Sequence, residues 1–134
     1  MPKEDFEGGC LCGAVRYKAS DITGAGYCHC RMCQKASGAP VVAWCGAPLD
    51  SFAWTQGKPK EYRSSPKAFR VFCSECGAQL GFHRAEAPTE MELNLATLDH
   101  PEKIAPRYHI YTSSQLPWLD IHDALPRYAG EREE

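Results

Sequence analysis

The chain has 134 residues and a formal charge of -2 at pH 7, which suits one domain with a hydrophobic core but is too short for two comfortable domains. Acidic and basic residues are mixed along it, so no basic surface is expected to collect phosphates, and nucleic acid is excluded as a first choice of partner. The charged N-terminus has no apolar core of the kind that a secretory leader carries, and no later run is long and apolar enough to span a membrane. We therefore expect a cytoplasmic protein, in which 8 cysteines indicate metal binding or redox chemistry rather than disulfides.

Alternation of apolar and polar residues predicts a series of short strands. In the segment MELNLATL, Met91, Leu93 and Leu95 fall on one face with polar residues between them, which is a period of two. Segments rich in glycine and proline separate these runs, so the sequence favours a mainly β domain of short antiparallel strands. The predicted strands lie at residues 10–19, 40–45, 52–54, 68–73, 79–84 and 91–98.

Helical character is confined to short segments. One helix is expected over residues 31–37, and it ends at Gly38 because glycine commonly follows the last helical turn. A second turn is expected within residues 118–126. We predict one domain over residues 1–134, with a core of about 6–128 and a flexible, solvated tail at 129–134.

Seven of the 8 cysteines form three groups along the chain. If residues 10–19 are a strand, the first two cysteines project from the same face and present two thiolates to one ion. The last pair is a Cys-x-x-Cys followed by Gly77, which is typical of a zinc-knuckle turn because glycine accepts a backbone conformation that other residues resist. The groups are Cys10 and Cys12; Cys28, Cys30 and Cys33; and Cys73 and Cys76.

The grouping of two, three and two cysteines fits one closed and one open metal site. A structural zinc ion normally has four protein ligands, whereas a catalytic zinc ion keeps three and leaves one position for water or substrate. The first and last pairs together complete a site of four thiolates. The middle group is then left as a site of three thiolates with an open position.

Two alternatives to an open zinc site remain. All seven cysteines could serve structural zinc, with a histidine as the last ligand, although His29 should point away because cysteines flank it in an extended stretch. A Cys-x-x-Cys pair could also be a redox pair, but that role needs a βαβ context that this sequence lacks. Cys45 lies in an apolar run and is expected to be a small buried hydrophobic residue.

Six blocks of the sequence carry a family resemblance over nearly the whole chain. The resemblance rests on GGCLCGAVRY, CHCRMCQKASGAP, FAWTQGKPKEYRSSP, RVFCSECGAQL, LATLDHP and HIYTSSQLPW, at residues 8–17, 28–40, 52–66, 70–80, 95–101 and 109–118. In these blocks the chain resembles the glutathione-dependent formaldehyde-activating enzymes, a grouping that also includes the relatives of centromere protein V.

The resemblance implies an Mss4-like zinc-binding fold and two zinc ions per chain. By the matching positions, Cys10, Cys12, Cys73 and Cys76 would hold the structural zinc ion, and Cys28, Cys30 and Cys33 the catalytic one. The implied activity is that of a carbon–sulfur lyase, which condenses formaldehyde with glutathione to S-(hydroxymethyl)glutathione. The partner would then be a small-molecule thiol. Two alternatives are a zinc enzyme of this family that acts on another small molecule, and a non-catalytic binding module, for which the chain lacks a basic extension.

Candidate residues for the reaction follow from the chemistry of the thiol. Three thiolates weaken the Lewis acidity of zinc, so we favour capture of a substrate thiol as thiolate over polarisation of the aldehyde. Glutathione carries two carboxylates and an ammonium group, and the expected substrate-binding residues are Arg70, Ser64 and Ser65, with Arg31 and Lys35 also suitable.

One histidine and several aromatic residues have two interpretations each. His109 is the candidate general acid or base, or else a half-buried histidine bonded to the backbone. The aromatic residues either line a pocket or fill the core: Trp44, Trp54, Phe72 and Trp118.

Overall fold

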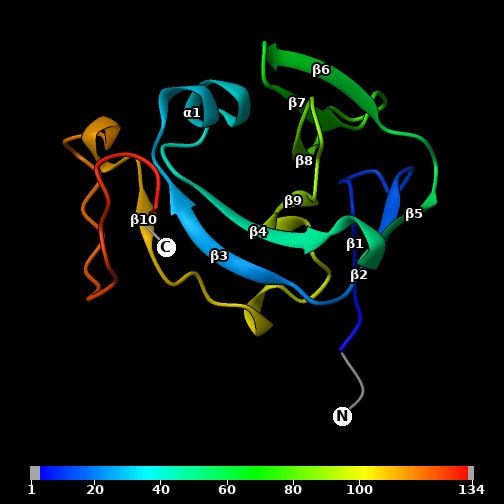
Figure 1. Cartoon of the computed structure of the whole chain (residues 1–134), viewed down its shortest axis with the longest axis horizontal. Helices are drawn as coiled ribbons and strands as arrows, with labels where there is room; N and C mark the ends of the chain where they lie inside the picture. The colour runs from blue at the N-terminus through cyan, green and yellow to red at the C-terminus, as the bar shows by residue number, and fades with distance from the viewer. Residues whose placement is uncertain (1–3, 133–134) are drawn as a thin grey trace.

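Ten strands form two sheets in residues 4–132, the part of the chain that this computed structural model describes. The smaller sheet has the order β1-β2-β5, and it lies at the opposite end of the molecule from β10 (Figure 1). Its strands are β1 (Phe6–Gly9), β2 (Arg16–Ala19) and β5 (Phe52–Gln56). The larger sheet has the order β10-β3-β4-β9-β8-β7-β6. Its strands are β3 (Thr23–Cys28), β4 (Val42–Pro48), β6 (Lys60–Ser65), β7 (Ala68–Phe72), β8 (Gln79–Arg84), β9 (Glu90–Asn94) and β10 (His109–Ile110).

This architecture confirms the prediction of a single, mainly β domain of short strands. All strand pairs are antiparallel except β10, which pairs parallel to β3. The helical elements are α1 (Arg31–Ser37) and four 3-10 turns, η1 (Leu49–Ser51), η2 (Leu95–Thr97), η3 (Pro101–Lys103) and η4 (Thr112–Ser114). Within residues 4–132, none of these helices has the length and apolar character needed to cross a membrane.

The register of the larger sheet separates a core face from a second face. Directly paired residues project to the same side of a sheet, and the next pair along projects to the other side. One row of paired residues runs across β4, β9, β8 and β7 through Cys45, Leu93, Gly81 and Val71. The adjacent row runs through Gly46, Glu92, Phe82 and Arg70. The first row belongs to the main hydrophobic core, so the second row faces away from it.

The predicted helix over residues 31–37 is confirmed, with α1 at the same bounds. The Cys30 side chain caps its start by accepting a hydrogen bond from the backbone N–H of Cys33. Gly38 ends it in the left-handed conformation at φ 75°, where its N–H donates to the carbonyl of Gln34. The second turn lies at the start of the expected range 118–126 and mostly before it, because the N–H of Leu119 donates to the carbonyl of Leu116 at 3.0 Å, whereas residues 120–126 have no turn.

The strand predictions were correct for five runs and wrong at the N-terminal run. Residues 10–15 form a loop between β1 and β2, so only the second half of the predicted strand 10–19 is a strand. Four strands were missed, the short strands β1 and β10, the glycine-rich β3 and the exposed edge strand β6, because none of these segments shows a sustained alternation of apolar and polar residues. The run 91–98 is a strand only to Asn94, after which Leu95 enters η2 but stays buried.

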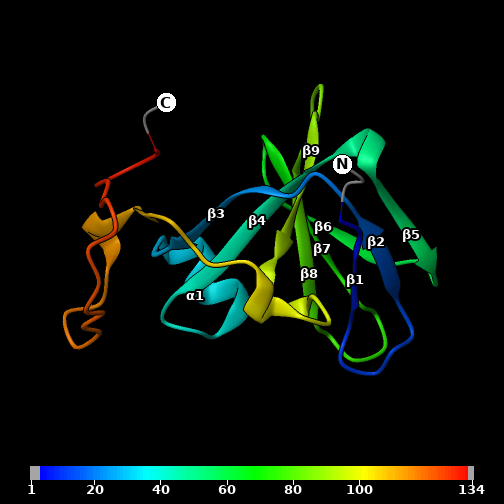
Figure 2. The same cartoon turned by 90° about the horizontal axis from the view of Figure 1, so that it is seen from below.

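The C-terminal segment runs beside β10 on the outer side of the larger sheet, as the orange and red ribbon in Figures 1 and 2 shows. The N–H of His109 donates to the carbonyl of Pro126, and the N–H of Tyr128 donates back to the carbonyl of His109, both at 2.9 Å. Farther along, the carbonyl of Gly130 accepts from the N–H of Tyr111 at 2.9 Å. The last two residues of the predicted tail, 133–134, lie outside the described residues.

Candidate metal centres

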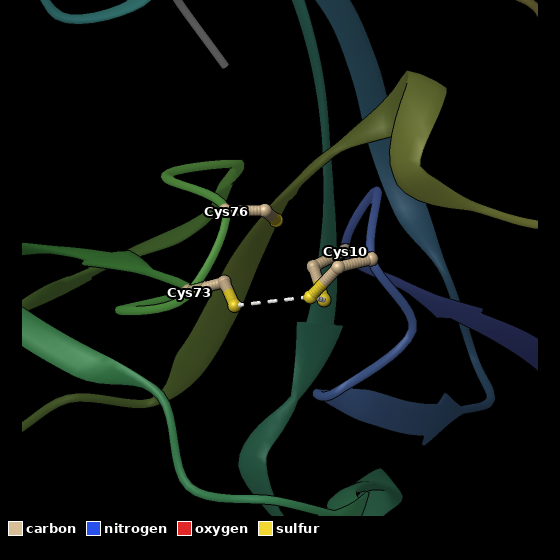
Figure 3. Close-up of side chains that lie close together, drawn as sticks. Cys10, Cys73 and Cys76 are labelled. Carbon is tan, nitrogen blue, oxygen red and sulfur yellow. Dashed lines mark hydrogen bonds between the residues drawn. The ribbon is translucent and has the colours of Figure 1, made fainter.

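Four cysteines from distant parts of the chain converge between the two sheets. Cys10 and Cys12 lie in the loop after β1, and Cys73 and Cys76 lie in the loop after β7; Figure 3 shows three of these side chains directed toward a common space. All four sulfur atoms lie within 4.8 Å of one another. The Sγ atoms of Cys10 and Cys12 are 3.6 Å apart, and those of Cys12 and Cys73 are 3.8 Å apart. We call these residues the four-cysteine cluster.

The backbone around this cluster is shaped to present sulfur atoms to a cation. Gly77 has φ 78°, which allows its N–H to donate back to the carbonyl of Cys73 at 2.8 Å and closes the predicted knuckle turn. Cys10 Sγ accepts from the N–H of Val15 at 3.3 Å, and Cys73 Sγ accepts from the N–H of Glu75 at 3.4 Å. These donors stabilise negative charge on sulfur, so the donor set fits a metal ion bound by four thiolates.

The other three cysteines meet where β3 leads into α1. Cys28 ends β3, Cys30 caps α1 and Cys33 lies in its first turn, and their sulfur atoms also lie within 4.8 Å of one another. Cys33 Sγ is 3.4 Å from Cys28 Sγ, and Cys30 Sγ accepts from the N–H of Cys33 at 3.3 Å. We call these residues the three-cysteine cluster.

Without a bound cation, the three thiols of the three-cysteine cluster do not ionise equally. The Cys28 thiol, followed by that of Cys33, lowers the pKa of the Cys30 thiol, and the contact with Cys30 in turn raises the pKa of Cys28. One sulfur therefore ionises at the expense of its neighbours. A cation would allow all three to be thiolates together, so the residues present fit a metal ion with three sulfur ligands.

A cavity of about 370 Å³ opens beside the three-cysteine cluster. Its volume is in the range of small-molecule sites. We call it the cysteine cavity. Its floor is the second face of the larger sheet, and its walls come from α1, the β10 segment and the C-terminal segment. The lining residues are Gly26, Cys28, Cys30, Arg31, Met32, Cys33, Trp44, Ser65, Arg70, Phe82, Glu92, Tyr108, Ile110, Tyr111 and Glu131.

Arg70 joins the cysteine cavity to the three-cysteine cluster. Its side chain is 7% exposed, and its guanidinium lies over the Phe82 ring at 5.3 Å from the ring centroid. One terminal nitrogen, Nη2, donates to Cys33 Sγ at 3.7 Å, whereas the buried Nη1 has no hydrogen-bond partner among the described residues. A buried guanidinium with an unused donor is costly, so Arg70 is suited to an anionic ligand.

The other predicted substrate-binding residues lie close to Arg70 but in different positions. Ser65 lines the cysteine cavity, whereas Ser64 lines a separate hollow between α1 and β6, which Arg70 also lines. The Oγ of Ser64 is buried with no hydrogen-bond partner in residues 4–132. Both serines end strand β6. Of the two basic candidates on α1, Arg31 lines the cysteine cavity and Lys35 lines the separate hollow.

His109 lies outside the lining of the cysteine cavity, in a chain of buried hydrogen bonds. It is 0% exposed; its Nδ1 lies 2.9 Å from Nε2 of His29, and its Nε2 lies 3.0 Å from Oδ2 of Asp123. The carboxylate accepts the proton of one nitrogen, so the other nitrogen accepts from His29. Both ring nitrogens of His109 are thus occupied. Through these two hydrogen bonds, the His109 ring connects Asp123 of the C-terminal segment to His29, which lies between Cys28 and Cys30.

The four aromatic candidates lie in different places, and Phe72 lines the separate hollow beside Ser64. Trp44 lines the cysteine cavity, where it packs edge-on against Phe82. Trp54 packs instead against Phe52 at the smaller sheet, and Trp118 is 71% exposed. Cys45 is buried as expected and lies in neither cysteine cluster, and burial raises its pKa to about 12.

Two lining residues were not predicted from the sequence, Glu92 and Glu131. Glu92 alternates with the apolar residues of β9 and was predicted only to lie on the opposite face of the strand from them. Glu131 lies in the segment that was expected to be a flexible tail. No local pattern distinguishes either residue from a surface glutamate; only the pairing of β9 with β8 and the path of the C-terminal segment bring both to the cavity.

Comparisons with known proteins agree on the family. A family model described as glutathione-dependent formaldehyde-activating enzyme matches residues 5–114. An uncharacterized lyase of Schizosaccharomyces pombe is 36% identical over 87 residues, and the match covers 58% of this chain but only 57% of that relative. The crystal structure of a Rhodobacter sphaeroides protein has a TM-score of 0.59 at 27% identity, covering 75% of this chain and 92% of the other. Since the family model spans most of the sequence and includes both cysteine clusters, the chain belongs to the glutathione-dependent formaldehyde-activating enzyme family.

Proposed function

We propose that this protein is a zinc-dependent carbon–sulfur lyase that joins formaldehyde, or a related small electrophile, to a thiol such as glutathione. The observation that carries the proposal is the position of the three-cysteine cluster in the wall of the cysteine cavity. A metal ion with three protein ligands beside a cavity keeps a position for substrate, whereas the four-cysteine cluster already supplies a complete set of ligands. Family membership and the lyase name of the Schizosaccharomyces pombe relative support the reaction class.

In this proposal each cysteine cluster holds one zinc ion. Zinc is favoured because all the donors are thiolates. The four-cysteine cluster, Cys10, Cys12, Cys73 and Cys76, would bind a structural ion, and the three-cysteine cluster, Cys28, Cys30 and Cys33, the ion used in the reaction. When bound at the three cysteines, zinc would keep a substrate thiol ionised at neutral pH.

Residues that line the cysteine cavity would bind the substrate and exclude water from it. Arg70 would bind a substrate carboxylate through its unused Nη1, and its contact with Cys33 holds the carboxylate site beside the metal ligands. Trp44 and Phe82 cover the floor with apolar surface, which excludes water from the reacting groups. The addition forms one carbon–sulfur bond, and the carbonyl oxygen takes up a proton in place of the one lost by the thiol.

The proposal is tested by measuring zinc and turnover in Cys30→Ser. Serine is a good helix N-cap, so the substitution removes one metal ligand while α1 keeps its cap. We expect two zinc ions per chain in the wild type and one in the variant by elemental analysis, and loss of the addition of formaldehyde to glutathione in the variant. Cys45→Ala is the control, because Cys45 lies in neither cluster and should keep both ions. A wild type that holds two zinc ions but does not accelerate the reaction would refute the proposed activity.

A further inference from the structure

The floor of the cysteine cavity carries opposite charges in one row. Arg70 pairs with Phe82, and Phe82 pairs with Glu92, so all three side chains project from the same face of β7, β8 and β9. Arg70 and Glu92 are therefore two strand spacings apart, which is about 10 Å between their backbones. The cation lies at the end of the row that contacts Cys33, and the anion lies across the Phe82 ring from it.

A second carboxylate and two tyrosine rings line the same cavity as Glu92. Glu131 lines the same cavity from the C-terminal segment, and its carboxylate accepts a hydrogen bond from the hydroxyl of Tyr111 at 3.1 Å. Tyr108 and Tyr111 also line the cavity; the Arg132 guanidinium lies over the Tyr108 ring at 4.5 Å from its centroid, so Tyr111 is the ring considered for a ligand. Carboxylates combined with the faces of aromatic rings form the type of surface that binds an ammonium group.

The electrostatic environment of Glu92 also favours a cation. Burial, followed by the charges of Glu90 and Glu131, raises the pKa of Glu92 to about 7, although Arg84 and Arg70 act in the opposite direction. The Glu92 carboxylate is thus partly desolvated and lies near other negative charges. A positive group bound at this position relieves that repulsion.

An independent observation indicates that the same cavity also requires an anion. Arg70 is more than nine-tenths buried, lines the cavity and has no partner for Nη1 within residues 4–132. One ligand with a negative and a positive group would satisfy both ends of the row. A ligand with only a carboxylate would offer Arg70 a partner but would offer Glu92 no positive group.

We propose that Glu92, assisted by Glu131, binds the ammonium group of the substrate while Arg70 binds its carboxylate, so that the cysteine cavity selects thiols that carry an amino-acid group. This inference rests on the proposed function, since it assigns the substrate class of the same site. It makes Glu92 a specificity-determining residue. Thiols whose amine is absent or acylated are expected to bind weakly.

The test compares two ligands that differ at the amino group, which is a charged ammonium in one and a neutral acetamide in the other. S-methylglutathione and N-acetyl-S-methylglutathione are titrated by calorimetry into the zinc-loaded protein, since the methyl group makes binding independent of thiol ionisation. The wild type should bind the free amine at least about 10-fold more tightly, which corresponds to one charge-assisted contact. In Glu92→Gln the two affinities should agree within about 2-fold, and Glu131→Gln should give an intermediate ratio.

Glu102→Gln is the matched control, because Glu102 is an exposed glutamate on η3 that does not line the cavity. It should retain the wild-type ratio. Equal affinities in the wild type, an unchanged ratio in Glu92→Gln, or no binding of either ligand would each overturn the inference. Circular dichroism of every variant shows whether it is folded.

A turnover assay with formaldehyde and glutathione shows whether a negative result contradicts this inference or the proposed function. If the wild type adds formaldehyde to glutathione but binds both ligands equally, the reaction stands and the role of Glu92 is refuted. If a ratio that depends on Glu92 is found without such turnover, the cavity recognises an amino-acid group and the proposed reaction is wrong.

Discussion

At the scale of single residues, two arginines show how burial changes the role of the same side chain. Arg70 and Arg63 each lie over a phenylalanine ring, at 5.3 Å and 5.2 Å from the centroids of Phe82 and Phe69. Arg63 lies on the exposed edge strand β6 and donates to the carbonyl of Pro66. Arg70 is buried and keeps one nitrogen without a partner among the described residues. Desolvation makes an interaction with a ligand carboxylate stronger at Arg70 than it could be at the surface.

We therefore predict that Arg70→Lys weakens substrate binding although it preserves the charge. Lysine lacks the planar fork that contacts Cys33 with one nitrogen and a carboxylate with another. The KM for glutathione should rise about 10-fold or more, which is the scale of losing one charge-assisted hydrogen bond. Steady-state kinetics measure this change. Arg63→Lys is the control and should leave KM unchanged; equal effects of both substitutions would contradict a binding role for Arg70.

Glu92 shows what the alternating pattern of a strand cannot predict. Alternation correctly separated Met91 and Leu93 from Glu92, and the first two are in the core. The pattern does not reveal what covers the other face of the sheet. In this protein that face is partly covered by α1 and the C-terminal segment, so Glu92 lines a cavity.

At the scale of elements, the two-residue strand β10 depends on its surroundings for stability. It pairs with β3 on one side, and the C-terminal segment is bonded to it on the other. His109 anchors this arrangement, since its ring stacks on Tyr27 at 4.8 Å and bonds to His29 and Asp123. Because β10 is short, side-chain contacts contribute much of what holds it in place.

Replacing His109 by phenylalanine is expected to destabilise the fold. The variant keeps a ring beside Tyr27 but leaves the buried Nε2 of His29 without a partner, and the Asp123 carboxylate keeps only its contacts with Arg127 and the N–H of Leu125. The free energy of unfolding should fall by about 2–4 kcal/mol, the cost of unsatisfied buried polar groups, as measured by urea denaturation. His122 is also paired with an aspartate, at 3.2 Å, but its side chain is 86% exposed, so His122→Phe should change stability by less than about 0.5 kcal/mol.

The same variant distinguishes positioning from proton transfer. If His109 holds the three-cysteine cluster in place through His29, folded His109→Phe should lose part of its zinc and part of its activity together. A variant that keeps both zinc ions but loses activity with an altered pH profile would instead indicate direct participation of His109 in the reaction.

At the scale of the whole molecule, the four-cysteine cluster connects the two sheets. Cys10 and Cys12 lie between strands of the smaller sheet, and Cys73 and Cys76 lie between strands of the larger one. A metal ion bound by all four would join parts of the chain separated by about sixty residues, which removes many conformations from the unfolded state. The three-cysteine cluster joins only neighbouring segments.

Loss of a ligand should therefore have different effects in the two clusters. Cys76→Ser is expected to lower the melting temperature by more than about 10 °C, because metal binding contributes several kcal/mol to folding in such sites. Cys30→Ser should lower it by only a few degrees while abolishing activity. Scanning calorimetry with zinc analysis measures both. If Cys30→Ser proved as destabilising as Cys76→Ser, the division into a structural and a reactive site would be wrong.

The sequence by itself determined the features that depend on local spacing. The three groups of cysteines, the helix from residue 31 to 37 with its glycine end, and most strands were predictable, because a short motif or a period of two specifies them. The tertiary structure decided the site around the cysteines. The row of Arg70, Phe82 and Glu92 arises from the register of three strands, and the contacts of His109 and Glu131 arise from the path of the C-terminal segment. Such contacts join residues far apart in the chain, and no local pattern encodes which strand pairs with which or in what register.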